Sequence, residues 1–256
     1  ITALDEFILV TPDAGVVLAI DAFASEVDVL AMQEIGTIAE NLCLARFPGT
    51  VRGTLCTVDQ VPNGSDISNV VAKAFMTVTP TADVGIQNGG GVRVEVPAGP
   101  YTIADAYTLL PFSNTLVTLE MTGQEIKDVL EDALANRLDD GGSDGSYPYA
   151  SGLRWDVDAT QPEDSRISNL EINSRLEDDW AAIDMGATYV IVTNNFIASG
   201  RDGYDAFAPI FADESKTVDT FTEYAQGFIN YIELVGTLSK LPFEEYSTQS
   251  YIAPAD

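Results

Sequence analysis

Histidine is absent from this sequence of 256 residues, and its absence excludes several classes of active site. A serine or cysteine nucleophile activated by histidine is ruled out, since histidine is the usual general base of such sites. Histidine is also a common ligand of zinc, iron and copper, so a hydrolytic centre with two metal ions is not expected within this chain. We therefore expect the chain to hold no cofactor of its own.

Positive charge is scarce as well, with 12 Lys and Arg residues against 40 Asp and Glu residues and a net charge of −28. A surface of this sign repels nucleic acids and anionic membranes, so we exclude DNA and RNA as partners. We interpret the acidity as a solvated shell, typical of proteins from saline environments. The acidic stretch 139–144 lacks the spacing and the closing glutamate of an EF-hand, and we expect a flexible loop there rather than a calcium site.

Apolar runs long enough to cross a bilayer are missing, so no membrane span is expected. The apolar share of 46% is ordinary for a globular protein, and 256 residues suffice for one sizeable core or one domain plus an extra element. Ile1 begins inside an ordinary segment, without an initiator methionine or a signal peptide. We therefore expect the chain to be a processed or excised piece of a longer protein.

Cysteine occurs only at Cys43 and Cys56. The two are too far apart for a CxxC redox pair and too few for a zinc site without other soft ligands. They can close a small disulfide loop around Arg46 and Arg52, as in an exported protein, and we favour this over two separate buried thiols. We accordingly predict an extracytoplasmic location: periplasmic, secreted or at the cell surface.

The pattern of apolar residues predicts helices interleaved with strands. Thr11 as a capping residue and Pro12 as the first helical residue predict a helix that runs to about Gln33. Further helices are expected after Ser65, from Thr102 to Pro111, from the capping box Thr122-Gly-Gln-Glu125 through Leu134, and from Asp219 or Thr220 through Ile232. Strands are expected at 83–87, 116–121, 153–157, 167–172 and 189–193, with an irregular tail from Pro242. Because regular crossover helices do not separate the strands, we predict an α+β fold, a mixed sheet layered with helices, rather than a doubly wound sheet.

Three short blocks set glycines or a proline beside side chains that bind small molecules. They are Asn88-Gly-Gly-Gly-Val-Arg93, Leu110-Pro-Phe-Ser-Asn114 and Asn194-Asn-Phe-Ile-Ala-Ser-Gly-Arg-Asp-Gly-Tyr204. Glycines let a ligand approach the main chain, and Arg93 can grip a phosphate or hydroxyls. Phe112 and Phe196 can stack on a base, and Asp202 can accept from two vicinal hydroxyls. Taken singly, each block has a structural alternative: a tight turn, a core phenylalanine, or an Asp side chain bonded to nearby backbone.

In this order the three blocks resemble the C-terminal, substrate-binding domain of the 5'-nucleotidase family, which carries NGGGIR, PFxN and NF…GGDGY segments. The resemblance extends from about Ile35 to Phe211 and implies the fold of that domain and a nucleoside or nucleotide as ligand. One departure is Gly200-Arg-Asp-Gly203, where the family has Gly-Gly-Asp-Gly. Whether Arg201 strains this turn or adds a cation near the ligand is left open by the sequence.

The resemblance also implies binding roles for particular residues. They are Phe112 and Phe196 around the base, Asn114 and Asn88 in hydrogen bonds to it, Asp202 on the ribose, Arg93 toward the ribose or phosphate, Arg52 and then Arg46 as the arginine pair that meets phosphate, and Gly152 lining the base pocket. The arginine pair is two residues further apart than in the family's R-x-x-V-R form. No catalytic residue is expected in this chain.

The family's catalytic part is a separate N-terminal metallophosphoesterase domain that holds two divalent metal ions. The resemblance therefore divides the chain into a lead-in or hinge helix at 1–34, continuing from that missing domain, and a nucleotide-binding domain at 35–256. It implies that this piece clamps the nucleoside while the partner domain of the same chain hydrolyses the phosphate ester, and that the piece alone is inactive. The alternatives are a stand-alone nucleoside-binding or structural module, and a self-sufficient hydrolase that uses carboxylates.

Overall fold

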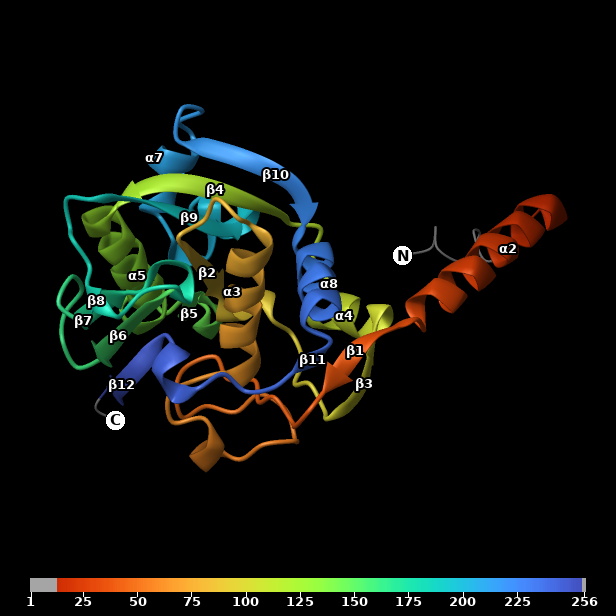
Figure 1. The fold of residues 1–256 in the computed structure, drawn as a ribbon, viewed down its shortest axis with the longest axis horizontal. Coiled ribbons are helices and arrows are strands. Elements are labelled where there is room, and N and C mark those ends of the chain that lie inside the picture. Colours follow the sequence, from red (N-terminus) through yellow and green to blue (C-terminus); the bar gives the residue numbers. More distant parts are fainter. Residues whose placement is uncertain (1–12, 255–256) are drawn as a thin grey trace, which may run out of the picture.

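The computed structural model describes residues 13–254. Helix α2 (Ala14–Ala31) projects from a rounded body that the rest of the described chain forms (Figure 1). The carboxylate of Asp13 caps this helix by accepting from the amides of Gly15 and Val16. The helix thus begins after Asp13 rather than at Pro12, and the predicted cap Thr11 lies outside the described residues.

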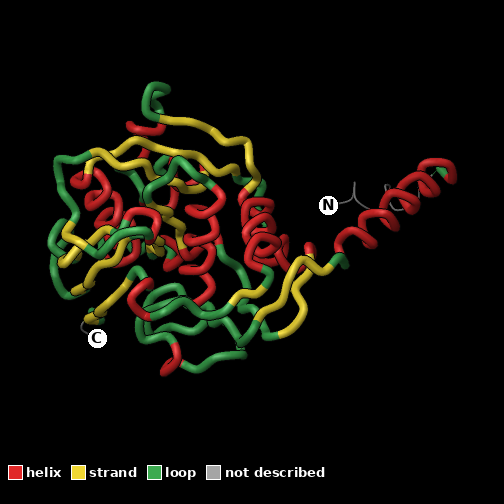
Figure 2. The backbone as a smooth tube through the Cα atoms, viewed as in Figure 1, coloured by secondary structure: helices red, strands yellow, loops and turns green. Residues whose placement is uncertain are grey.

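A mixed sheet of five strands forms the centre of the body (Figures 1 and 2). Its order is β10 (Thr217–Glu223), β4 (Thr115–Thr122), β9 (Thr188–Asn194), β2 (Val84–Asn88) and β5 (Pro148–Ser151). Strands β9 and β2 run parallel, and the other neighbouring pairs run antiparallel. The predicted α+β class with a mixed sheet is confirmed.

Helices cover both faces of this sheet. Helices α3 (Asp66–Val78) and α8 (Tyr224–Val235) pack on one face, and α5 (Gly123–Leu138) and α7 (Phe207–Phe211) pack on the other. Successive residues of β9 point to opposite faces, so Ile191 joins the core under α5 while Val192 joins the core under α3. Gly85 lets α3 approach β2 closely, since a Cβ there would lie 2.5 Å from the carbonyl oxygen of Ala72.

Two smaller sheets flank the central one. The first has the order β12 (Thr248–Ile252), β6 (Leu153–Asp158), β7 (Ile167–Ile172) and β8 (Ala181–Ala182), and the second has β11 (Thr237–Leu238), β1 (Glu34–Ile38) and β3 (Gly99–Thr102). Strand β1 follows α2 almost directly and pairs in parallel with β11 near the other end of the chain. The short helices α4 (Ile103–Leu109) and α6 (Asn195–Ala198) follow β3 and β9.

The caps read from the sequence are confirmed at three helices. Ser65 caps α3, and the reciprocal boxes of Thr102 with Asp105 and of Thr122 with Glu125 open α4 and α5. In each box, side chains form hydrogen bonds with free amides at the start of the helix. The residues that begin these helices can therefore be recognised in the sequence.

Two predictions near the end of the chain are wrong. Asp219 and Thr220 do not start a helix, because they belong to β10, which pairs with β4, and α8 begins only at Tyr224. The tail is not irregular, because 248–252 forms β12 and pairs with β6. Both strands are short and half polar, so their pairing with distant strands, rather than their own pattern, decides their conformation.

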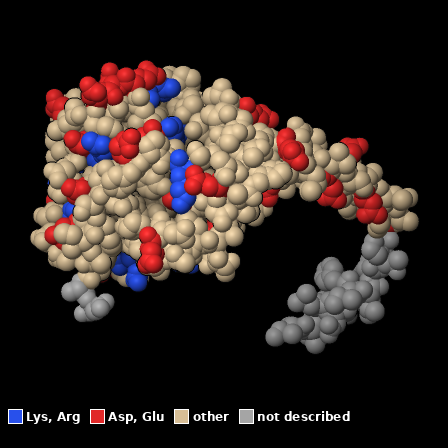
Figure 3. All heavy atoms as spheres, turned by 60° about the horizontal axis from the view of Figure 1, so that its bottom comes forward, with Lys and Arg blue, Asp and Glu red and all other residues tan. Residues whose placement is uncertain are grey.

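Acidic side chains are spread over the face drawn in Figure 3 and continue along α2, while Lys and Arg residues are fewer. Within the described part of the chain, no helix combines the length and apolar character required to pass through a membrane.

Candidate functional site

A cavity of about 390 Å³ lies where two parallel strands of the central sheet end. Strand β2 ends at Asn88 and continues into the turn Gly89–Gly91, and β9 ends at Asn194 and continues into α6. Because parallel strands end at the same edge of a sheet, these two turns meet. The buried side chain of Asn194 locks the junction by accepting from the amides of Phe196 and Ile197 and donating to Gln87 at 2.9 Å.

The three sequence blocks and the disulfide loop meet around this cavity. It is lined by Arg46, Arg52, Asn88, Gly90, Gly91, Arg93, Phe112, Asn114, Ser143, Asp144, Phe196 and Asp202. All the residues to which the sequence assigned a binding role are among them, except Gly152. Their individual roles toward a ligand stay predictions.

Two aromatic rings in the cavity wall are left accessible. Phe112 is 45% exposed and Phe196 is 39% exposed, although most large apolar side chains of the body are buried. The backbone of Phe112 is fixed by a hydrogen bond from its amide to the hydroxyl of Tyr224 at 2.9 Å, and Phe196 is held in α6 by the cap from Asn194. The two rings are thus presented on anchored backbone, as a surface for a flat apolar group.

Asp202 reaches the cavity from a left-handed turn. Its φ is 62°, and Gly200 and Gly203 on either side also have positive φ. Asn88 donates to the Asp202 carboxylate at 2.8 Å. Burial raises the pKa of the Asp202 carboxyl, against the smaller lowering effects of the Asn88 bond and the charge of Arg46. A half-buried carboxylate of this kind is an acceptor for hydroxyl donors.

Arg201 does not strain the turn that precedes Asp202. Its φ is not among the positive values of this segment, so a side chain fits where the family has glycine. The strained position is Asp202 itself. Gly203 also has a packing requirement, since a Cβ there would come within 2.2 Å of Cβ of Asn136. Arg201 is exposed and does not line the cavity.

Arg46 places a buried cation at the cavity. It is only 6% exposed, and its Nε atom has no hydrogen-bond partner among the described residues. Burial lowers the pKa of its guanidinium, and the nearby charges of Arg52 and Arg93 lower it further. Gly145 makes room for it, since a Cβ at Gly145 would lie 2.7 Å from Nη1 of Arg46. The charges of Asp144 and Asp202 act in the opposite direction, but within residues 13–254 no carboxylate lies within ion-pair distance of Arg46. A buried cation without an ion-pair partner is costly, and an anion in the cavity would supply one.

Two further arginines line the same cavity from exposed positions. Arg52 forms an ion pair with Asp144. Arg93 donates to the carbonyl of Gly90 at 3.1 Å, and its guanidinium lies 5.7 Å from the centre of the Phe112 ring. One cationic side chain of the cavity, Arg93, therefore lies next to an aromatic ring of its wall, which suits a ligand with an aromatic part and an anionic part.

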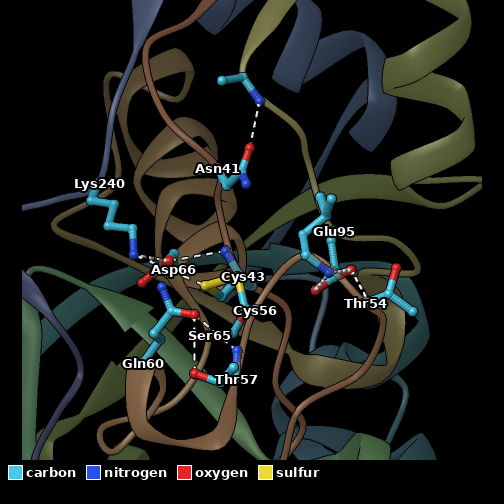
Figure 4. Close-up of a disulfide and its surroundings, with 12 residues drawn as sticks. Asn41, Cys43, Thr54, Cys56, Thr57, Gln60, Ser65, Asp66, Glu95 and Lys240 are labelled. Atoms are coloured by element: carbon cyan, nitrogen blue, oxygen red, sulfur yellow. Dashed lines mark hydrogen bonds and ion pairs between the residues drawn. A yellow bond between two sulfur atoms is a disulfide. The ribbon is translucent and has the colours of Figure 1, made fainter.

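The predicted disulfide between Cys43 and Cys56 is confirmed (Figure 4). It closes a segment that contains both Arg46 and Arg52 and has little regular structure. Buried Asp66 anchors this segment by accepting from the Cys43 amide at 2.9 Å and pairing with Lys240 at 2.8 Å (Figure 4). The hydroxyl of Tyr149 donates to the carbonyl oxygen of Arg46 at 3.0 Å, which fixes the backbone beside the buried guanidinium.

Gly152 lies outside the cavity lining, between β5 and β6. Its φ is +78°, and a Cβ there would come within 3.1 Å of the carbonyl oxygens of Asp83 and Asn173. Backbone geometry accounts for this glycine, and its place in a base pocket stays a prediction.

Sequence reasoning missed Ser143 and Asp144 as lining residues. They belong to the acidic stretch that was considered for calcium, and Asp144 opens the short turn Asp144–Ser146 that precedes β5. Two carboxylates of this stretch form ion pairs with arginines: Asp144 with Arg52, and Asp139 with Arg166 at 2.7 Å.

The Cys, Asp and Glu side chains of the described residues do not form a metal centre. Across residues 13–254, no three Cys, Asp or Glu side chains gather in a way that could hold an ion, and histidine is absent from the sequence. No step of a reaction is therefore assigned to a metal within this chain.

The family profile "5'-nucleotidase, C-terminal domain" matches residues 34–209. The chain is 35% identical to the NAD 5'-nucleotidase of Haemophilus influenzae over 223 residues, which cover 86% of this chain and 36% of that protein. It is 32% identical to a probable 5'-nucleotidase of Treponema pallidum over 239 residues, which cover 89% of this chain and 38% of that protein. The chain therefore spans well under half the length of these relatives.

Solved structures give the same grouping. The structure of the NAD nucleotidase of Haemophilus influenzae aligns with a TM-score of 0.79 and 31% identity, over 94% of this chain and 42% of that one. A 5'-nucleotidase precursor from Thermus thermophilus aligns with a TM-score of 0.74 and 28% identity, over 92% of this chain and 43% of that one.

Proposed function

Because this chain belongs to the family of 5'-nucleotidase C-terminal domains, we propose that it is the substrate-specificity part of an exported 5'-nucleotidase. In this proposal the cavity at the ends of β2 and β9 binds the nucleoside of a nucleotide and holds its phosphate group. A second domain of the same protein, which the longer relatives have room for, hydrolyses the phosphate ester with two divalent metal ions.

The observation that carries the proposal is the buried guanidinium of Arg46, which has no ion-pair partner among the described residues, in the same cavity as the rings of Phe112 and Phe196. A buried cation without a partner calls for an anion, and two accessible rings on anchored backbone call for a flat group. A nucleotide has both a flat base and an anionic phosphate, and its size suits a cavity of about 390 Å³.

The chain's own residues divide the work as follows. The rings of Phe112 and Phe196 stack on the base, and the Asn114 amide bonds to its edge with one donor and one acceptor. Asp202, held by Asn88, accepts from the ribose hydroxyls. This chain binds and orients the substrate and has no part in bond cleavage.

Three guanidiniums hold the phosphate end of the nucleotide. Arg46 meets it from the buried side, while Arg52 and Arg93 meet it from the exposed side of the cavity. Planar guanidinium groups match phosphate oxygens in pairs, which fixes orientation as well as charge.

An extracytoplasmic location is part of this proposal. The disulfide between Cys43 and Cys56 supports it, because such bonds form and persist in oxidising compartments. The protein carries a net charge of −28, so it can bind an anionic nucleotide only where cations cluster locally.

Calorimetric titration with adenosine tests the clamp. Phe196→Ala is expected to weaken adenosine binding roughly tenfold or more, because stacking on one aromatic ring is worth about 1–3 kcal/mol per base. The matched control is Phe221→Ala, which removes a phenyl ring that is 86% exposed and lies outside the cavity. Equal adenosine affinity in the Phe196→Ala variant and the unaltered chain discards the clamp.

A phosphatase assay of the chain with AMP and added manganese tests the division of labour. No release of phosphate is expected, since the residues of this chain bind rather than cleave. Release of phosphate above the no-protein control would instead support a self-sufficient hydrolase.

A further inference from the structure

One carboxylate in the cavity is at odds with a site for an anion. Asp144 lines the cavity together with Arg46, Arg52 and Arg93, and it forms an ion pair with Arg52. The side chains of Asp144 and Arg52 are 39% and 50% exposed. An ion pair this accessible to water contributes little to stability, so the fold does not require it.

We propose that Asp144 is a specificity-determining residue that limits how much negative charge the phosphate end of the cavity accepts. The inference rests on the proposed function, because it assumes that Arg52 meets the ligand's phosphate. A phosphate that approaches Arg52 must either displace the Asp144 carboxylate or lie beside it. In both cases Asp144 adds a free-energy cost to binding. This cost grows with the charge on the phosphate and vanishes for an uncharged nucleoside.

The backbone keeps the Asp144 carboxylate at the cavity. Asp144 starts the short turn Asp144–Ser146, in which the amide of Gly145 donates to Oγ of Ser143 at 2.9 Å. The carbonyl of Ser146 accepts from the buried hydroxyl of Tyr204 at 2.8 Å. These two bonds hold the main chain on the C-terminal side of Asp144 beside the cavity.

Asp144, rather than another charged group of the cavity, sets the limit on the charge of the ligand's phosphate. Asp202 is already engaged by Asn88 and belongs to the hydroxyl-binding part. Among the described residues, neither Arg46 nor Arg93 has a carboxylate within ion-pair distance, so Arg52 alone is directly compensated in this cavity. Removing the Asp144 charge releases Arg52 for the ligand and removes a repulsion at the same time.

The rival role for Asp144 is to hold Arg52 in place for the ligand. The two roles differ in the sign of the effect when Asp144 is neutralised. A limit on charge predicts tighter binding of phosphate-bearing ligands, whereas a support for Arg52 predicts weaker binding.

Calorimetric titration of Asp144→Asn with three ligands of increasing charge distinguishes the two roles. The ligands are adenosine, the methyl ester of AMP with one negative charge on phosphorus, and AMP with two above a pH of about 6. The affinity for AMP is expected to rise roughly fivefold to tenfold at pH 8, as for removal of one nearby like charge in partly screened surroundings. The methyl ester is expected to gain less, and adenosine to stay within about twofold of the unaltered chain.

Asp140→Asn is the matched control, because Asp140 is an exposed carboxylate of the same stretch outside the cavity lining. It is expected to leave all three affinities unchanged. An equal gain for AMP in both variants would reduce the effect to overall charge and overturn the proposal, as would an unchanged or weakened AMP affinity in Asp144→Asn. Adenosine binding to the unaltered chain tests the proposed function separately. If adenosine does not bind, both the proposed function and the proposed role of Asp144 are overturned.

Discussion

Asn88 and Asp202 stand 114 positions apart in the sequence, and the side-chain amide of Asn88 donates to Oδ2 of Asp202 at 2.8 Å. Asn88 is the last residue of β2, and Asp202 lies in the turn that follows α6. The bond exists because β2 and β9 are parallel neighbours whose ends bring the two turns together. No other hydrogen bond to the Asp202 carboxylate occurs within residues 13–254, so Oδ1 is left as an acceptor for a ligand.

Asp202→Asn is expected to separate stability from binding. Burial raises the pKa of Asp202, so the fold disfavours the charged carboxylate, and this cost is present at neutral pH. Neutralising the side chain should leave the free energy of unfolding unchanged or higher in urea titrations at pH 7. Adenosine should bind roughly tenfold more weakly, because hydrogen bonds to a charged acceptor are worth about 1.5–3 kcal/mol. Lower stability together with unchanged adenosine affinity contradicts the assignment to ribose.

The same carboxyl predicts how adenosine binding depends on pH. As the pH falls through the raised pKa of Asp202, the carboxylate gains a proton and loses its capacity as a charged acceptor. Adenosine affinity should therefore begin to decline at a higher pH than the ordinary Asp pKa of about 3.9 predicts. Titrations at a series of pH values check this, and Asp202→Asn should flatten the profile. Identical profiles for the variant and the unaltered chain would assign the decline to another group.

Arg46→Met should weaken phosphate binding without loss of stability. The methionine replaces most of the buried volume and removes a desolvated charge that has no partner on Nε, so urea unfolding should occur at the same or a higher concentration. AMP affinity should fall roughly tenfold or more, since a charge-assisted bond to the phosphate is lost. Adenosine affinity should change by less than about threefold, because only the anionic end of the ligand loses a contact.

Arg201→Met is the control for that loss of charge. Arg201 lies one residue before Asp202 but is exposed and outside the cavity lining. Its replacement should leave the AMP affinity unchanged. If Arg201→Met reduces AMP binding as much as Arg46→Met does, the effect arises from net charge and Arg46 has no special role.

The disulfide should stabilise the fold and position the two arginines that it encloses. Replacing both Cys43 and Cys56 by serine is expected to lower the free energy of unfolding by about 2–4 kcal/mol. In the remaining folded protein, AMP should lose more affinity than adenosine, because Arg46 and Arg52 lie inside the closed segment while the two rings lie outside it. Equal losses for both ligands would mean that the bond acts only on the stability of the domain.

The cavity was predictable from the sequence to the extent that its residues sit in short blocks after strands. Gly89–Gly91, Phe112 and Asp202 stand beside glycine, proline or asparagine, whose backbone preferences mark turns at strand ends. Asp144 was not predictable as a lining residue, because its contact with Arg52 joins segments 92 positions apart and depends on how two loops pack.

For the fold, elements with local signals were predictable and elements made by pairing were not. The capping boxes of Thr102 and Thr122 fix helix starts through bonds within four residues. By contrast, β12 exists because 248–252 lies beside β6, and β10 because 217–223 lies beside β4. Short polar segments carry little of this information, since a partner strand supplies both their hydrogen bonds and their packing.

Removal of residues 1–33 tests the predicted boundary between a lead-in helix and a nucleotide-binding domain. No residue of α2 is buried, so the two cores under the central sheet lose almost no contact when the helix is absent. The shortened chain should unfold cooperatively, with a Tm within about 4 °C of the full chain, and should keep its affinity for adenosine. The contrasting variant lacks residues 248–256. This deletion removes β12, which pairs with β6, and exposes the buried surface around Thr248. Its Tm should therefore fall by more than about 4 °C. Loss of cooperative unfolding on removal of 1–33 would mean that α2 belongs to the domain, in spite of its exposure.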